Sequence, residues 1–265
     1  MEQPTKHEPL IVAHRGASAY APENTLAAIK LAIECGADGV EFDVQLARDG
    51  VPVVIHDQTL DRTALRAGVV SDHTSAALNE IDVGSWFNAK HPDRASSDFA
   101  LQTVPTLDEV LKALQQFHGL IYIELKPNEN DLRSLVNAVC DHLRVSPLRP
   151  QIIVKSFSFA ALPEIKHHLP DVQTAALFAP TIMDILRRRR DIVSIARAFG
   201  ADQISVHRSL VTRKLISAAA HAQMPVTVWT SDKPKWVRKC QKLGIRALIT
   251  NDPAKLLKYR NEIAR

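Results

Sequence analysis

This chain of 265 residues has few cysteines, and that scarcity excludes two classes of protein. Its three cysteines, Cys35, Cys140 and Cys240, are far apart in the sequence. An odd and widely spaced set builds neither a disulfide framework nor a cysteine metal site. The first nine residues also lack the apolar stretch of a secretory signal. We therefore expect packing cysteines in a reducing, cytoplasmic protein.

Long hydrophobic runs and a strong charge of one sign are also missing. No run approaches the roughly 20 apolar residues of a membrane span, so we expect no stable membrane insertion. The 33 basic and 29 acidic residues leave a formal net charge of +4. This excess is too small to indicate a nucleic-acid partner, and it suits a small anionic substrate. The oligomeric state stays unknown at this level.

Short β-rich runs alternate with helical stretches along the chain. The predicted strands are 10–14, 39–46, 51–56, 120–125, 152–156, 174–178, 203–207, 225–230 and 246–250. The predicted helices are 24–35, 106–117, 130–143, 159–168, 181–198, 211–222, 232–243 and 253–262. Several strands are almost wholly apolar, as in parallel sheets buried on both faces. The alternation therefore predicts a parallel α/β sheet.

One strand pair departs from this alternation. Asp49-Gly50 lies between two alternating apolar runs, which predicts an antiparallel hairpin. Without the return strand, eight βα units remain, which is the composition of a (β/α)8 TIM barrel. Residues 57–104 have weak periodicity, and we interpret them as a small inserted cap between the second barrel strand and its helix. We expect residues 1–265 to form a single catalytic barrel domain.

The connection between the first strand and the first helix carries polar groups that suit a site. His14 and Arg15 end the strand, at the edge where barrel enzymes place their active sites. An imidazole beside a guanidinium indicates proton transfer at an anionic centre, such as a phosphate. Glu23 and Asn24 follow, and two interpretations stay open. They line the site, or Glu23 is a charge of the first helical turn and Asn24 its cap.

Two carboxylates on one face of the second strand indicate a metal ion. Glu41 and Asp43 are two residues apart, so their side chains point to the same side of the sheet. Two buried carboxylates require a positive partner. Their hard oxygen atoms favour Mg²⁺ or Ca²⁺.

The hairpin predicts the place of a second histidine. If Asp49-Gly50 is a two-residue loop, Asp43 lies directly opposite His56, and the imidazole reaches the carboxylates. A different loop length would shift the register by one residue and turn His56 to the other face.

Later strands add further candidates. Glu124 and Lys126 share a face at the end of the next barrel strand, so Glu124 completes a three-carboxylate set and Lys126 can pair with a phosphate oxygen. Trp229 either forms a wall of the pocket or packs in the core. Asn251 and Asp252 precede the last helix and are most simply explained as its cap.

The motifs taken together resemble the glycerophosphodiester phosphodiesterase family. They are His14-Arg15-Gly16, Pro22-Glu23-Asn24-Thr25, Glu41-x-Asp43, Asp49-Gly50, Val53-Val54-Ile55-His56-Asp57, Arg62-Thr63, Gly84-Ser85-Trp86-Phe87, Val104-Pro105-Thr106-Leu107, Glu124-Leu125-Lys126-Pro127 and Ser156-Phe157. Their order and spacing match from about residue 10 to residue 257.

This resemblance implies a (β/α)8 barrel that hydrolyses a glycerophosphodiester to glycerol 3-phosphate and an alcohol. It implies a divalent ion on Glu41, Asp43 and Glu124, with His14 and His56 as the acid/base pair. Arg15 and Lys126 would hold phosphate oxygens. The sequence does not say which histidine is the acid, or whether water attacks directly or after a cyclic phosphate forms.

Near the C-terminus this chain reads Trp229-Thr230-Ser231-Asp232 where the family often has Trp-Thr-Val-Asn. That departure leaves the choice of leaving group open. Two alternative functions follow. One is a lysophospholipase D-type enzyme, for which Trp86, Phe87 and Phe99 of the cap could supply an apolar groove. The other is a barrel that binds glycerophosphodiesters without turnover.

Overall fold

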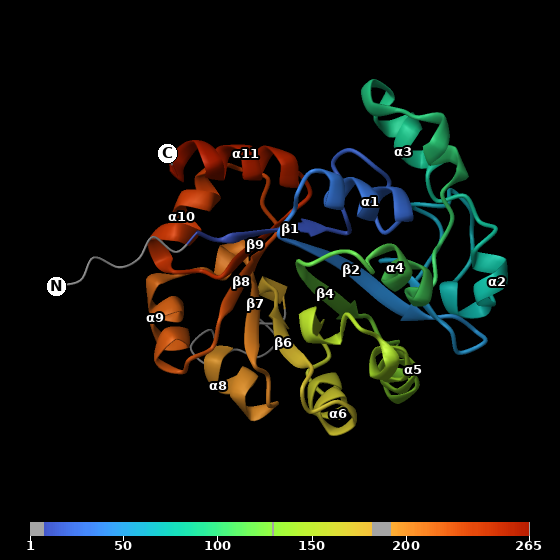
Figure 1. Ribbon diagram of the computed structural model, residues 1–265. Coiled ribbons are helices and arrows are strands. Elements are labelled where there is room, and N and C mark those ends of the chain that lie inside the picture. Colours follow the sequence, from blue (N-terminus) through green and yellow to red (C-terminus); the bar gives the residue numbers. More distant parts are fainter. Residues whose placement is uncertain (1–7, 129, 182–191, 265) are drawn as a thin grey trace.

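The computed structural model describes residues 8–128, 130–181 and 192–264, and their strands form a closed barrel (Figure 1). The strands are β1 (Leu10–His14), β2 (Gly39–Leu46), β3 (Pro52–Val54), β4 (Leu120–Leu125), β5 (Ile152–Ser156), β6 (Gln173–Phe178), β7 (Gln203–His207), β8 (Val226–Trp229) and β9 (Ala247–Thr250). Each barrel strand runs parallel to its neighbours, and β1 pairs with both β2 and β9. The predicted eight-stranded parallel barrel is confirmed.

Helices surround the barrel on its outer side. They are α1 (Leu26–Glu34), α4 (Leu107–Ala113), α5 (Leu132–Val145), α6 (Ala161–His168), α8 (Ile192–Ala198), α9 (Arg213–His221), α10 (Lys235–Leu243) and α11 (Pro253–Ala264). Residues 182–191 of the predicted helix 181–198 lie outside the described residues. None of the described helices is long and apolar enough to cross a bilayer.

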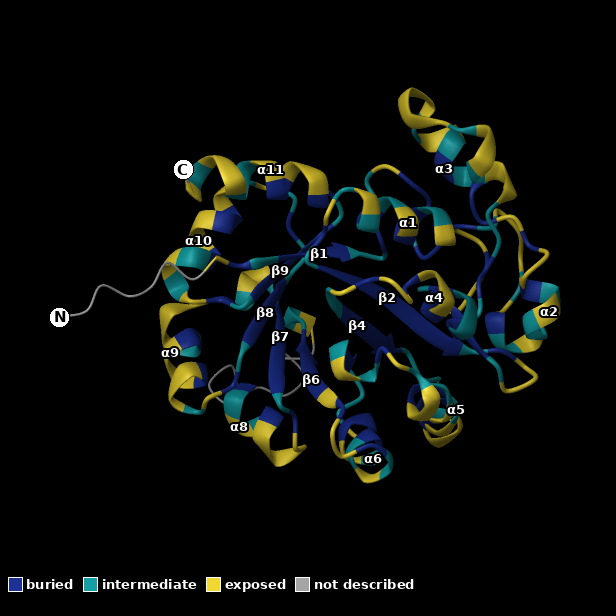
Figure 2. Ribbon diagram, viewed as in Figure 1, coloured by how far each residue is buried: buried dark blue, intermediate teal, exposed yellow. Residues whose placement is uncertain are grey.

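Burial follows the two-layer pattern of a barrel, with buried strands and helices exposed on their outer faces (Figure 2). Two large apolar clusters fill the space between strands and helices. A third cluster, which includes Val12, Tyr122 and Ile153, fills the barrel itself. The barrel interior is therefore packed with side chains.

Local signals in the sequence set the helix starts. Thr25 caps α1, because its Oγ1 accepts a hydrogen bond from the Ala28 N–H. The interpretation of Asn24 as this cap is therefore wrong. Thr106 and Glu109 form a complete capping box at the start of α4.

The hairpin exists, but its predicted register is wrong by one residue. β3 is antiparallel to β2, with Val44 opposite Val54, and the Ile55 N–H donates to the Asp43 carbonyl. Residues 48–50 form a three-residue loop, since the Ala47 N–H donates to the Val51 carbonyl. Gly50 takes the left-handed conformation, φ 78°, that ends such a loop. Ile55 therefore takes the place predicted for His56.

The insertion between β3 and α4 consists of short helical segments. They are η1 (Val70–Asp72), α2 (Ser75–Leu78), α3 (Ser85–Lys90), η2 (Pro92–Arg94) and η3 (Ser97–Leu101). Its apolar residues, such as Leu60 and Leu78, pack with Val53 and Ile55 of the hairpin in one cluster. The cap therefore shares its apolar contacts with the barrel's hairpin.

Candidate functional site

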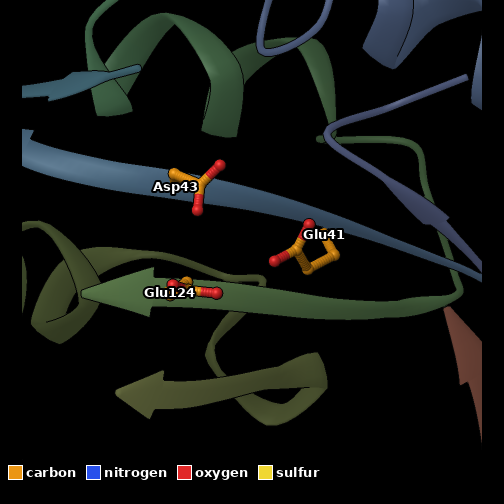
Figure 3. Close-up of side chains that lie close together, drawn as sticks. All are labelled: Glu41, Asp43 and Glu124. Carbon is orange, nitrogen blue, oxygen red and sulfur yellow. The ribbon is translucent and has the colours of Figure 1, made fainter. Parts of the chain in front are cut away.

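Strand register brings three buried carboxylates together at the C-terminal end of the barrel. Asp43 on β2 lies opposite Glu124 on β4, and Glu41 lies two residues before Asp43 on the same face. One carboxylate oxygen from each residue lies within 4.8 Å of the others. Figure 3 shows the three side chains converging from β2 and β4. All three are buried, so their charges require compensation from nearby groups.

Asp43 is compensated from the connection between β1 and α1. The Arg15 Nε lies 3.0 Å from Asp43 Oδ2, and the Asn24 Nδ2 donates to the same oxygen at 2.9 Å. Burial alone would raise the pKa of Asp43, but Arg15 and Lys126 outweigh it and hold this pKa well below its usual range. Asn24 thus belongs to the site rather than to the helix cap.

The backbone of this connection is also specialised. Arg15 and Asn24 both have left-handed φ angles, 55° and 58°, which non-glycine residues rarely adopt. The Arg15 N–H donates to Glu41 Oε2 at 3.1 Å. A Cβ on Gly16 would lie 2.5 Å from the Ala28 backbone, so glycine is required there. The turn thereby presents the Arg15 side chain to Asp43.

Two lysines complete the charge balance. The Lys126 Nζ lies 2.8 Å from Glu124 Oε1 and 3.4 Å from Asp43 Oδ1. The Lys155 Nζ lies 2.6 Å from Glu41 Oε1 and 3.3 Å from Glu124 Oε2. Three cationic side chains, with Arg15 as the third, therefore face three carboxylates.

The sequence reasoning missed Lys155. It stands on β5 opposite Glu124, and only 2% of it is exposed. Burial alone would lower the pKa of Lys155, but Glu41 and Glu124 outweigh that effect and raise it. A lysine within the apolar run Ile-Ile-Val-Lys-Ser was the available signal, because a buried lysine requires a charged partner.

Asn251, which directly follows the neighbouring strand β9, holds His14 in place. The His14 Nδ1 lies 2.7 Å from Asn251 Oδ1, while the Asn251 Nδ2 donates to Asp232 Oδ2 at 3.0 Å. Because a carboxylate only accepts, the amide nitrogen must face Asp232, and Asn251 Oδ1 accepts a hydrogen bond from the His14 Nδ1–H. The His14 Nε2 is then directed to the site, 4.0 Å from Glu41 Oε2.

This contact revises the interpretation of Asn251 as a helix cap. Asp252 supplies the cap, since its Oδ1 accepts from the Lys255 N–H. Burial is the main reason that the pKa of His14 lies below its ordinary value. Its side chain nevertheless keeps 18% of its surface exposed, so a ligand can reach it.

His56 is the second residue after the end of β3, so the segment that follows the strand determines its position. Its Nδ1 lies 2.5 Å from Asp57 Oδ1. The buried Gln45 Nε2 donates to three consecutive carbonyls, those of Ile55, His56 and Asp57, at 2.8–3.1 Å. His56 lines one cavity with Lys126 and a second with Glu23 and Asn24, so it lies at the same end of the barrel despite the changed register. Gln45 is a second residue that the sequence reasoning missed.

Glu23 ties the cap to the barrel. It accepts hydrogen bonds from Arg15 at 2.7 Å and from both Arg62 terminal nitrogens at 2.8 Å. The Arg62 Nε also contacts Asp57, the partner of His56. Burial would raise the pKa of Glu23, but the Arg62 and Arg15 contacts lower it to about 2. Glu23 lies before the cap residue Thr25, and the first turn of α1 holds no acidic residue, so the interpretation of Glu23 as a charge of that turn is wrong.

Aromatic rings and a cavity bound the site. Trp229 at the end of β8 stacks edge-on against Phe157 and His207, with ring centroids 5.7 and 5.2 Å apart, and packs on the cluster inside the barrel. Trp229 therefore packs against the interior of the barrel and also borders the end of the barrel that holds the carboxylates. A cavity of about 430 Å³ opens beside His56 and Lys126.

The residues present suit a divalent cation. Asp43 Oδ1 is buried and accepts no hydrogen bond within the described part of the chain. The donor set is three carboxylates, which are hard oxygen ligands of the kind that Mg²⁺ and Ca²⁺ prefer. Glu41, Asp43 and Glu124 could hold such an ion together.

Several known proteins of similar sequence are described as glycerophosphodiester phosphodiesterases. Residues 14–255 match the glycerophosphoryl diester phosphodiesterase family. The Bacillus subtilis protein YhdW is 33% identical over 250 residues, 94% of this chain and 96% of that protein. The glycerophosphodiester phosphodiesterase of Caldanaerobacter subterraneus subsp. tengcongensis is 30% identical, again over 94% of this chain and 96% of its own length.

A solved structure gives the same result. A phosphodiesterase of Oleispira antarctica in complex with its product sn-glycerol-3-phosphate superimposes with a TM-score of 0.84 and 27% identity. The match covers 96% of this chain and 97% of that one.

Proposed function

This chain belongs to the glycerophosphoryl diester phosphodiesterase family, and we propose that it cleaves glycerophosphodiesters with a bound divalent ion and a histidine pair. It is a glycerophosphodiester phosphodiesterase, which yields glycerol 3-phosphate and an alcohol. The observation that carries the proposed mechanism is the buried cluster of Glu41, Asp43 and Glu124, with His14 4.0 Å from Glu41 and His56 lining the cavity beside Lys126. The sn-glycerol-3-phosphate in the Oleispira antarctica relative agrees with this product class.

Arg15 and Lys126 bind the phosphate in this proposal. Both already pair with Asp43, and the Lys126 side chain is 19% exposed at the mouth of the cavity. Their charges offset the negative charge that develops on the phosphoryl oxygens. A divalent ion held by Glu41, Asp43 and Glu124 would supply Lewis-acid stabilisation of a non-bridging oxygen.

His14 and His56 carry the protons. Each ring has its Nδ1 engaged, by Asn251 or by Asp57, so each can offer Nε2 to the reacting atoms. One ring accepts a proton from the attacking hydroxyl or water, and the other donates one to the leaving alcohol. Imidazoles suit both tasks because they change protonation near neutral pH.

The direct experiment is incubation of the purified protein with glycerophosphocholine and either Mg²⁺ or Ca²⁺, followed by measurement of glycerol 3-phosphate. We expect turnover with a divalent ion, its loss in EDTA, and its recovery when the ion is returned. Full activity after exhaustive chelation would overturn the metal part of the proposal. No product from any headgroup in the presence of both ions would overturn the reaction itself.

The lysophospholipid alternative needs an apolar groove. The cap aromatics instead pack on one another: Phe87 is fully buried and meets Trp86 and Phe99 edge-on at 5.8 and 5.6 Å. We therefore favour the water-soluble diester. Comparing kcat/KM for glycerophosphocholine and lysophosphatidylcholine separates the two, with the larger value expected for glycerophosphocholine.

The cellular setting is also a proposal. Cys35, Cys140 and Cys240 are all free, and burial raises the pKa of the Cys240 thiol to about 12. Free thiols agree with a reducing cytoplasm, which fractionation of the producing cell would test.

A further inference from the structure

Lys155 occupies an unusual place among the carboxylates. It is the fourth residue of β5, and the register aligns it with Glu124 on β4, which in turn aligns with Asp43 on β2. A lysine inside a barrel is desolvated, and its charge persists there only with carboxylate partners. Its Nζ finds two of them, Glu41 Oε1 at 2.6 Å and Glu124 Oε2 at 3.3 Å.

The three cationic side chains of the site differ in how easily they can move away from the carboxylates. The Lys126 side chain is 19% exposed and the Arg15 side chain 16%, and both lie where a phosphate can draw them away. The Lys155 side chain is 2% exposed and stands on a central barrel strand between β4 and β6. Withdrawal of its ammonium group would leave it in the apolar interior without a partner, so Lys155 stays with Glu41 and Glu124.

We infer that Lys155 is a built-in counter-ion of the carboxylate cluster, which holds Glu41 and Glu124 in position without a divalent ion and lowers the affinity of the cluster for that ion. This inference rests on the metal site proposed above. Both effects follow from one contact, because an ammonium group and a divalent cation repel each other while they share the same carboxylates. Lys155 is thus a positioning residue that sets how much free metal the enzyme needs.

The test measures metal binding, not activity. Lys155→Met removes the charge and keeps a long apolar stem. Isothermal titration with CaCl2 alone is expected to give a Kd at least tenfold lower for this variant than for the wild type. Lys166→Met is the matched control, because it removes a lysine–carboxylate pair with Asp202 outside the site, and its Kd should equal that of the wild type.

Thermal unfolding supplies the second measurement. Without metal, Lys155→Met should melt at a lower temperature than the wild type, since its carboxylates have lost a partner, and saturating CaCl2 should raise its melting temperature more. If the variant does not fold without the ion, it is purified with Ca²⁺ and its Kd is measured by competition with a chelator of known affinity.

Two results would contradict the inference in distinguishable ways. An unchanged or weaker Ca²⁺ affinity in Lys155→Met would overturn the role of Lys155 alone. Absence of binding of both Ca²⁺ and Mg²⁺ to the wild type and the variant would overturn the metal site, and this inference with it.

Discussion

At the scale of single residues, the proposed chemistry depends on two histidines, each of which engages a partner through its Nδ1. The His14 Nδ1–H donates a hydrogen bond to Asn251, which Asp232 holds in one orientation. His56 engages Asp57, which Arg62 holds. Each imidazole therefore has its Nδ1 engaged, which agrees with the acid/base role that we propose for the pair.

Replacement of either histidine tests this arrangement. His14→Ala and His56→Ala should each lower kcat by roughly 10²-fold or more, because proton transfer in the transition state is lost. The measurement is release of glycerol 3-phosphate at saturating glycerophosphocholine. His221→Ala is the control, since this exposed ring hydrogen-bonds the Ser217 carbonyl of its own helix and lies outside the candidate site. A near-normal rate would remove that histidine from the mechanism.

We propose that Asn251 positions His14 through the hydrogen bond to its Nδ1. In Asn251→Ala the ring loses its Nδ1 acceptor, so kcat should fall by up to about 10²-fold while the substrate KM changes little. Asn79→Ala in the cap, which loses a hydrogen bond from Thr103 instead, should leave kcat unchanged. Equal kinetics for the two variants would show that Asn251 does not orient His14 for catalysis.

At the scale of elements, the β2–β3 hairpin positions His56 by a side chain rather than by strand pairing. β3 ends at Val54, and the Gln45 amide then binds the carbonyls of the next three residues. A buried carbonyl without a partner is costly, so this amide both stabilises the chain and directs the ring that follows β3.

Two substitutions in the hairpin separate the effect on stability from the effect on the position of His56. Gln45→Leu should lower the free energy of unfolding by about 1–3 kcal/mol, because buried carbonyls lose their donor. It should also lower kcat, since the segment that carries His56 is released. Gly50→Ala should lower the free energy of unfolding by about 1 kcal/mol through its left-handed φ, with kcat unchanged. Urea titration and the phosphodiesterase assay check both, and an unaltered kcat in Gln45→Leu would refute the positioning role.

At the scale of the whole molecule, the cap and the barrel are joined by apolar and ionic contacts. Leu60 and Leu78 of the cap pack with Val53 and Ile55 of the hairpin, and Arg62 binds Glu23 beyond β1. We therefore propose that residues 1–265 form one cooperative domain.

Tryptophan placement makes this proposal measurable. Trp86 lies in the cap, while Trp229 and Trp236 lie in the barrel unit. A variant with Trp86 as its only tryptophan should show the same urea midpoint by fluorescence as by far-UV circular dichroism. A cap that unfolds at lower urea would show a separate fluorescence transition, and the single-domain proposal would then be wrong.

The sequence by itself determined the barrel, because apolar strands that alternate with helices have few other ways to bury both faces. It also placed Glu41 with Asp43, and Glu124 with Lys126, because strand periodicity decides which side chains share a face. These inferences use only the local geometry of one strand.

Only the tertiary structure decided the register, that is, which residues of neighbouring strands lie opposite one another. The hairpin register depended on whether the loop has two or three residues, and Asp-Gly is compatible with either. Lys155 and Asn251 gained partners more than 30 and 230 residues away through the parallel register and closure of the barrel. A single lysine or asparagine in a sequence does not indicate such partners, since the contact arises only when distant strands align.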